Sequence, residues 1–283
     1  MSEAEICKKI ELSKHNLVNA DLTEARIKGA NLSQGNLMRA ILQKADLSEV
    51  DFRGADMMGT LFDNSDLTGA LFTGSHMTQA VFNEACLDRA NFSGANLANC
   101  VFKWAKMVGT IFSKGIMTQT IFTGIESDQV QFIKVDLTHS NFREAVIKGA
   151  KFNYSKCIRT DFRETVMEGC DFSQAILGQA DFSVSNISKT QFTSANLSQV
   201  NFTSTELEDV HFTDTNLERA DFTDVDLKGV HFKNARLAGA NLEETVNLSS
   251  EQINLAQIDK KTKLPPYLEV IWEGKKFECK PRE

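Results

Sequence analysis

The sequence predicts an all-β solenoid, in which a short repeat coils around one continuous core. The first observation is a five-residue period: from Leu12 to Leu242 every fifth residue is apolar, and Ser127 is the only polar residue at these central positions. The second is a ten-residue period, because a Phe occupies every second central position from Phe52 to Phe232. The third is a small side chain, most often Ala, two residues before the centre.

A five-residue period fits neither regular secondary structure. In an α-helix, which advances about 100° per residue, the step would rotate the apolar position away from any fixed face. In a simple strand, an odd step would move it to the opposite side of the sheet. The remaining solution is a backbone that turns a corner every five residues, so that each central side chain points to a common interior axis.

Asp or Asn often lies between the small residue and the centre, as in Ala20-Asp21-Leu22. Such side chains hydrogen-bond nearby backbone groups and favour turns. Over residues 10–245 the chain thus resembles the pentapeptide repeat family, whose unit is A-(D/N)-L-x-x. The resemblance implies a right-handed, four-sided parallel β-helix with twenty residues per coil, which gives about twelve coils over residues 10–245. It also implies that the centre and the residue two before it face inward.

We expect three segments: a lead-in over residues 1–9, the repeat domain over 10–245 and a C-terminal cap over 246–283. Ser249 and Gln252 form a capping-box pattern that opens a short helix, with Ile253, Ala256 and Ile258 on its apolar side. A Leu-Pro-Pro tail follows. Similar segments close the solenoid in relatives, and in some of them form a dimer contact, so the resemblance implies a cap and allows a homodimer.

Composition favours a cytoplasmic protein. The chain has a formal net charge of −7 and is 42% hydrophobic, with no apolar run long enough to span a membrane. Its first residues lack the apolar core of a secretory signal. The six Cys show no C-x-x-C spacing, which fits a reducing compartment.

No motif for a nucleophile, a phosphate-binding loop or a zinc site is present, so we predict no enzymatic activity and no cofactor. His211 and His231 occupy the same outward position twenty residues apart, which places them about 5 Å apart on adjacent coils. That separation suits a metal ion, but no third ligand is evident from the sequence. We therefore expect two stacked surface imidazoles and no metal.

Ser127 breaks the central rule, and Ile125 is bulky at a position where Ala is usual. We interpret this pair as an exchange of volume between the two inward sites of one coil. A functional kink is the alternative interpretation.

The outward charges are unevenly distributed over the four faces. If the segment centred on Leu12 lies on the first face and each next segment on the following face, the third and fourth faces carry −12 in total and the first and second carry +4. Acidity increases toward the C-terminal coils. The candidate acidic contact residues are Glu206, Glu208, Asp209, Asp221, Asp224 and Asp226.

An apolar stripe is predicted on the third face, where outward positions are normally polar. We define this stripe as five apolar residues spaced by twenty, with one Trp beside them: Ile41, Leu61, Val81, Val101, Ile121 and Trp104. Contiguous exposed apolar surface usually marks a contact with a partner or a second copy. The alternative is a ladder of β-branched residues that support one another in the sheet.

The first function that we predict is a non-enzymatic scaffold that presents flat faces to a protein partner, through the apolar stripe. The second is an acidic DNA mimic that binds gyrase or another topoisomerase, as the resemblance to Qnr-type members implies. The two differ in salt dependence, because only the electrostatic contact weakens strongly as ionic strength rises. A secreted bacterial effector is a third class in the family. Direct nucleic-acid binding is not expected, because no face is strongly basic.

Overall fold

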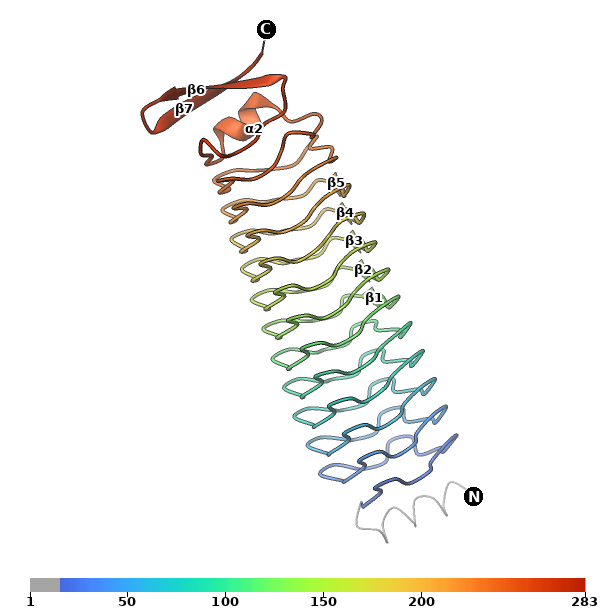
Figure 1. Cartoon of the computed structure of the whole chain (residues 1–283). Helices are drawn as coiled ribbons and strands as arrows, with labels where there is room; N and C mark the ends of the chain where they lie inside the picture. Colours follow the sequence, from blue (N-terminus) through green and yellow to red (C-terminus); the bar gives the residue numbers. More distant parts are fainter. Residues whose placement is uncertain (1–15, 283) are drawn as a thin grey trace.

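Residues twenty apart in the sequence lie side by side along most of the chain. The computed structural model describes residues 16–282, and in it parallel bridges join Asn16 to Asn36, Asn36 to Asp56, and so on as far as Arg236. The chain therefore winds into an all-β parallel solenoid with twenty residues per coil (Figure 1). The predicted coil length is confirmed, whereas the lead-in predicted for residues 1–9 lies outside the described part of the chain.

A turn follows each central residue and sets the corners of the coil. In a typical segment, the amide of Ala20 donates to the carbonyl of Leu17 at 3.0 Å, and Asn19 between them has a φ of 55°. The residue before the centre supports the turn, because Asp21 Oδ1 accepts a hydrogen bond from the amide of Thr23 at 3.0 Å. This is the local role that the sequence predicts for Asp and Asn. Five residues thus suffice for one side of the coil and one corner.

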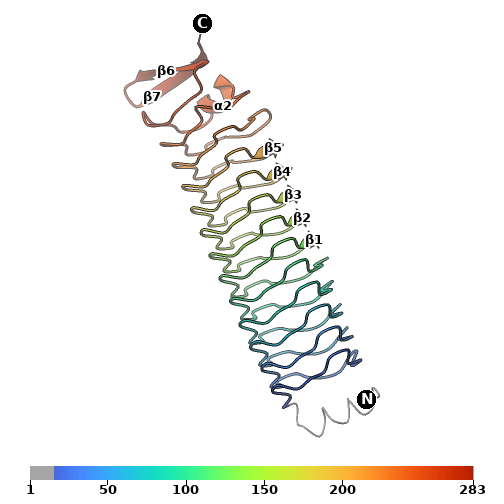
Figure 2. The same ribbon diagram turned by 45° about the vertical axis from the view of Figure 1, so that its right-hand side comes forward.

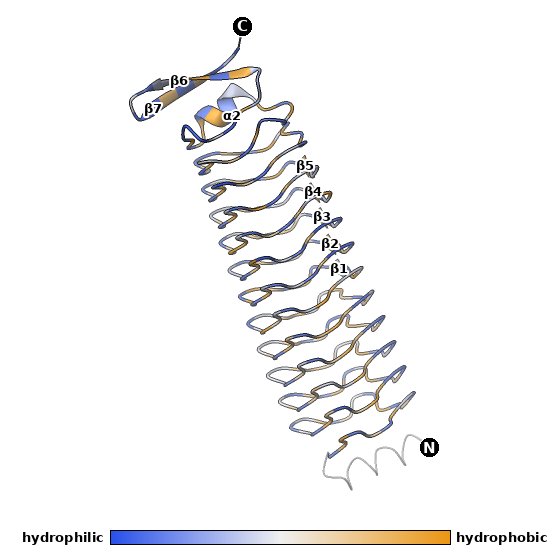
Figure 3. Cartoon of the chain, viewed as in Figure 1, coloured by the Kyte–Doolittle hydropathy of each residue, from blue (hydrophilic) through white to orange (hydrophobic). Residues whose placement is uncertain are grey.

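The interior is a continuous stack of aromatic rings. Phe52 and Phe72, one coil apart, stack with their centroids 5.0 Å apart and their planes 6° from parallel. Phe62, on the opposite side of the coil, meets Phe52 edge-on at 6.0 Å and 78°. Both arrangements are the favourable ones for aromatic pairs, at about 0.5–1.5 kcal/mol each beyond burial. Hydrophobic residues recur in every coil (Figure 3), and the buried ones form one core along the solenoid.

The fourth face carries a five-stranded parallel sheet that begins near the middle of the solenoid and continues toward its C-terminal end (Figure 2). Its order is β1-β2-β3-β4-β5, with partners twenty residues apart. The strands are β1 Glu126–Asp128, β2 Val146–Lys148, β3 Val166–Glu168, β4 Asn186–Ser188 and β5 Glu206–Glu208.

Ser127, the exception at the central positions, is the middle residue of β1 and is only 6% exposed. Ile125, two residues earlier, is fully buried. The inward placement of both side chains agrees with an exchange of volume between them. The exception therefore coincides with the start of the sheet.

A short helix and a hairpin follow the last coil (Figure 1). The helix α2, Ser250–Asn254, has the predicted capping box between Ser249 and Gln252. It buries Ile253, and the Gln252 side chain donates to the carbonyls of Leu227 and Val230, both at 2.8 Å.

Two features of this C-terminal segment differ from the sequence prediction. The helix is shorter than expected, because it ends at Asn254, before Ala256 and Ile258. The tail after the prolines is an antiparallel hairpin of β6 Leu268–Glu273 and β7 Lys276–Pro281. Gly274 in its two-residue turn has a φ of 65°, the conformation that such turns require.

Within residues 16–282, no helix is long and apolar enough to cross a membrane.

Candidate partner-binding surfaces

The apolar stripe forms one unbroken ladder on the third face. Parallel bridges join its members in the order Ile41, Leu61, Val81, Val101 and Ile121. Each of these side chains is half-buried, because each lies between its neighbours in the coils before and after. Polar residues continue the ladder at both ends, Asp21 before Ile41 and Asn141 after Ile121. The apolar ladder is therefore bounded at both ends along the solenoid.

Trp104 is the most exposed member of the stripe. Its side chain is 58% exposed, and its backbone lies at a corner with a φ of 57°. Gly124 occupies the same corner one coil later, where a Cβ would lie 2.6 Å from Trp104 Cδ1. The absence of a side chain at Gly124 gives the indole room to lie against the next coil.

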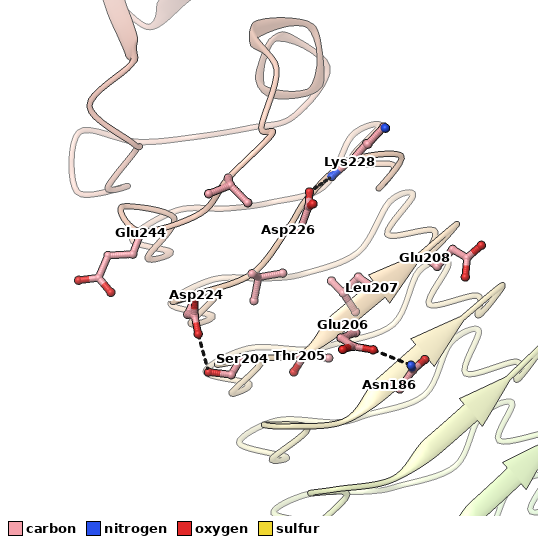
Figure 4. Close-up of a pocket in the computed structure, with 12 residues that line it drawn as sticks. Asn186, Ser204, Thr205, Glu206, Leu207, Glu208, Asp224, Asp226, Lys228 and Glu244 are labelled. Atoms are coloured by element: carbon pink, nitrogen blue, oxygen red, sulfur yellow. Dashed lines mark hydrogen bonds between the residues drawn. The ribbon is translucent and has the colours of Figure 1, made fainter.

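Four of the six predicted acidic contact residues line one groove near the C-terminal end of the fourth face (Figure 4). The groove has a volume of about 510 Å³. Its carboxylates come from three successive coils: Glu206, Glu208, Asp224, Asp226 and Glu244. Leu207, Val225 and Val246 supply its apolar lining, and Lys228 is its one cationic residue among those described.

Neutral hydrogen-bond donors hold several of these carboxylates. Asn186 Nδ2 donates to Glu206 Oε2 at 2.7 Å, and Ser204 Oγ donates to Asp224 Oδ2 at 3.0 Å (Figure 4). The backbone amide of Lys228 donates to Asp226 Oδ1 at 2.9 Å. Since these donors are uncharged, they orient the carboxylates without neutralising them. The groove therefore presents negative charge in fixed positions.

The other two predicted acidic residues lie elsewhere. Asp221 is on the third face, where its Oδ1 accepts hydrogen bonds from the amide and hydroxyl of Thr223 at 2.9 and 2.6 Å and from Asn241 Nδ2 at 3.1 Å. Asp209 lies at the corner between the fourth and first faces, beside His211. The acidic C-terminal coils thus contain a groove and two separate carboxylates.

The acidic groove lies where the backbone of the fourth face changes. β5 is extended, whereas in the next coil the chain returns to the ordinary turn, with the amide of Val230 donating to the carbonyl of Leu227 at 3.2 Å. A second groove of about 320 Å³ lies at the other end of the sheet, between the coil of Lys106 and β1. Its floor includes Ser127, and its charged residues have both signs. Each end of the β1–β5 sheet therefore carries a groove.

His211 and His231 stack as the sequence predicts, with ring centroids 4.3 Å apart and planes 15° from parallel. The structure adds a third group that the sequence analysis missed. Asp209 Oδ1 lies 3.3 Å from His211 Nε2 and 3.8 Å from His231 Nε2. The spacing of two residues between Asp209 and His211 was the available signal, but the corner that brings them together is visible only in three dimensions.

Two family models match nearly all of the repeat. Pentapeptide repeats in eight copies match residues 16–54, 55–94, 85–124 and 131–169, and a pentapeptide repeat region matches residues 165–242. The chain belongs to the pentapeptide repeat family. No curated protein sequence matches this pentapeptide repeat protein.

Several solved structures are similar to this pentapeptide repeat protein. HetL, a pentapeptide repeat protein involved in heterocyst differentiation regulation in the cyanobacterium Nostoc sp. strain PCC 7120, is 19% identical; the match covers 84% of this chain and 97% of HetL with a TM-score of 0.50. A trypsin-treated form of QnrB1, a plasmid-mediated fluoroquinolone resistance protein, is 16% identical over 76% of this chain and 92% of that one, with a TM-score of 0.36. The periplasmic alginate epimerase AlgG is 7% identical over 86% and 76%, with a TM-score of 0.46. These similarities concern the fold alone.

The buried thiols of this pentapeptide repeat protein are poor nucleophiles. Burial raises the pKa of both Cys157 and Cys170 to about 12, and it also raises the pKa of Cys100 well above its usual range. Since the thiolate is the reactive form, these three side chains act as small core residues.

Proposed function

We propose that this protein is a non-enzymatic scaffold that binds a protein partner through the apolar stripe, with Trp104 as the main contact. The proposed scaffold is a right-handed, four-sided rod of about twelve coils. Because parallel bridges hold each coil to the next, the stripe is presented without the ordering cost that a flexible loop would add on binding.

The observation that carries this proposal is the exposure of Trp104 at a corner with positive φ. A left-handed backbone costs a residue with a Cβ roughly 1–2 kcal/mol, and Gly is the residue that avoids this cost. Gly occupies this corner in the next coil, at Gly124. The other corners of the described solenoid are occupied mostly by Gly or by polar residues, so the turn itself does not require an exposed indole at this one. Trp is, however, among the residues that most often dominate the energy of protein interfaces.

Variants of two matched corner residues test the proposal. Tyr154 is an exposed aromatic residue, 53% accessible, at a corner with a φ of 59°, outside the stripe. The full chain and its Trp104→Ala and Tyr154→Ala variants would be used to capture partners from the source cell, with quantitative mass spectrometry. We expect a partner that Trp104→Ala loses and Tyr154→Ala keeps, at both about 0.15 M and about 1 M NaCl. Equal capture by all three proteins would contradict the proposal.

A second candidate function rests on the acidic groove. Its five carboxylates come from successive coils and are matched by one Lys, so the groove favours a strongly basic partner surface. We propose as the alternative that the C-terminal coils mimic the phosphates of DNA and bind gyrase or a related topoisomerase.

Gyrase supercoiling assays with and without a fluoroquinolone test this alternative. The Asp224→Asn/Asp226→Asn variant removes two charges from the groove, and Asp46→Asn/Asp66→Asn removes two from the N-terminal part of the same face. Mimicry by the groove predicts that inhibition or drug protection is lost in the first variant only, and declines at high salt. No effect of the wild-type protein at high micromolar concentration would rule it out.

We also propose a cytoplasmic location and a homodimer formed through the C-terminal segment. The five cysteines among the described residues are all free, which suits a reducing compartment. Leu255, Tyr267 and Ile271 are exposed apolar residues of the C-terminal segment, at 57%, 40% and 46%. Light scattering would distinguish a dimer from a monomer, and an Ile271→Lys variant is expected to remain monomeric.

A further inference from the structure

Three side chains with metal-binding atoms converge at one corner of the solenoid. Asp209 follows β5 at the corner between the fourth and first faces, with a φ of 52°. His211 lies two residues later at an outward position of the first face, and His231 is its bridged partner in the next coil. One ligand atom from each of the three residues lies within 4.8 Å of the other two.

The backbone fixes the positions from which these side chains project. The amide of His211 donates to the carbonyl of Thr190 at 3.1 Å, and the amide of His231 donates to the carbonyl of Val210 at 3.0 Å. The residue after each histidine is a buried Phe of the core. Because the core and the bridges hold both coils, the two imidazoles approach each other without any loop having to close.

The surroundings leave the three groups accessible. The side chains of His211, His231 and Asp209 are 32%, 52% and 59% exposed. The corner one coil after Asp209 is Gly229, and a Cβ built there would have no atom within 4 Å. The nearest Lys at the preceding corner, Lys189, pairs with Glu168 at 3.7 Å. Among the described residues, the contacts of the Asp209 carboxylate with charged or titratable partners within 4.0 Å are those to the two histidines, and all three side chains are open to solvent.

We propose that Asp209, His211 and His231 form a surface site for a divalent transition-metal ion, with zinc as the reference ion. Two imidazole nitrogens and one carboxylate oxygen are ligands that Zn²⁺ accepts, at about 2.0–2.2 Å in a tetrahedral arrangement completed by water. Such bonds place neighbouring ligand atoms about 3.3–3.4 Å apart. Asp209 Oδ1 is 3.3 Å from one Nε2 and 3.8 Å from the other, close to this separation. The two rings are 15° from parallel, so both imidazoles must rotate out of the stack to direct their Nε2 lone pairs to a common ion.

A bound ion would join two coils close to the end of the solenoid. Asp209 and His211 belong to one coil and His231 to the next. The coil of His231 also holds α2, because the carbonyls of Leu227 and Val230 accept hydrogen bonds from the Gln252 side chain. Since an ion that binds only the folded chain stabilises it by mass action, zinc is expected to raise the melting temperature.

Isothermal titration of the full chain with zinc chloride, in a buffer that does not chelate metals, tests the site. We expect one zinc ion per chain, and at least about tenfold weaker binding for His211→Gln, His231→Gln and Asp209→Asn. His139 provides the matched control, because it is an exposed histidine at a different corner and His139→Gln is expected to bind zinc normally.

A second measurement separates the site from unspecific binding. In histidine ring NMR spectra, zinc is expected to shift the signals of His211 and His231 and to leave those of His76 and His139 in place. Absence of zinc binding by the wild-type chain at high micromolar concentration would overturn the proposal. Unchanged binding by the double variant His211→Gln/His231→Gln would overturn it as well.

Discussion

The coils that carry the apolar stripe and the coils that carry the acidic groove share one interior and differ on the outside. Phe82 and Phe102 stack at 4.7 Å beneath the stripe, and Phe182 and Phe202 stack at 5.3 Å near the groove. On the outer surface, one region has an apolar ladder with Trp104 and the other has clustered carboxylates. The two inward positions of each segment therefore determine the fold, and the three outward positions determine what each region can bind.

The largest predicted effect tests whether the two interiors are equivalent. Phe82→Ala and Phe182→Ala each remove a fully buried ring, so each is expected to lower the free energy of unfolding by about 3–5 kcal/mol. Urea unfolding followed by circular dichroism measures both. Phe277→Ala serves as the control, because Phe277 is only partly buried in β7 and lies outside the stack. A loss in one region less than half that in the other would show that the cores differ.

The next effect concerns the boundary between the two regions, at Ser127. Ser127→Leu adds volume beside the fully buried Ile125, and overpacking of this kind costs about 1–3 kcal/mol. The double variant Ile125→Ala/Ser127→Leu restores the usual small and large inward residues, so most of the lost stability is expected to return. A double-mutant cycle measures this coupling. Additive losses would contradict the exchange of volume between the two sites.

The sequence was sufficient to predict the repeat because each inward position is occupied by one kind of residue in every coil. The twenty-residue coil and the Phe stacks follow from that rule. The rule does not extend to the tail, where β6 and β7 form a hairpin around Gly274 that the sequence analysis missed. A single two-residue turn gives a much weaker pattern than a repeated segment.

The candidate surfaces were predictable only in part. The apolar stripe could be predicted because its members share one position in consecutive coils. The acidic groove depends on a change of backbone after β5, and the centre at that change, Leu227, is an ordinary apolar residue. The approach of Asp209 to the histidines depends on a corner, where residues two apart meet. Charge counts by face indicate that the C-terminal coils are acidic, but they do not show which carboxylates share a groove or that Asp209 lies beside the histidines.

A smaller effect tests how Trp104 is seated in the stripe region. Gly124 and Gly74 are corner residues with φ of 66° and 67°, but a Cβ at Gly124 would meet the Trp104 ring at 2.6 Å, whereas one at Gly74 has no atom within 4 Å. Gly74→Ala is expected to cost about 1 kcal/mol for the backbone alone. Gly124→Ala is expected to cost more and to weaken partner binding, because it displaces the indole. Equal unfolding free energies of the two variants would show that Trp104 does not rest on Gly124.

The smallest effect involves an ion pair on the third face, between the two regions. Burial alone would raise the pKa of Asp161. The hydrogen bonds and the positive charge of Arg163 lower this pKa by more than burial raises it, so the pKa lies below its usual value. Arg163 Nε and Nη2 donate to the two carboxylate oxygens at 2.9 and 2.7 Å. A lowered pKa in the folded chain stabilises it at neutral pH, and this stabilisation is lost as the pH falls below about 4.

Replacing either partner of this pair should therefore remove the same pH-dependent contribution. Asp161→Asn and Arg163→Gln are each expected to cost less than about 1 kcal/mol at pH 7, because the Arg163 side chain is 43% exposed and solvent screens the pair. Both differences from the wild-type chain should shrink as the pH is lowered below about 4. Urea unfolding at a series of pH values measures them. A difference that stays constant with pH would mean that Asp161 acts through its backbone turn, as Asn does at the same position in the preceding coil, and that its charge adds nothing to stability.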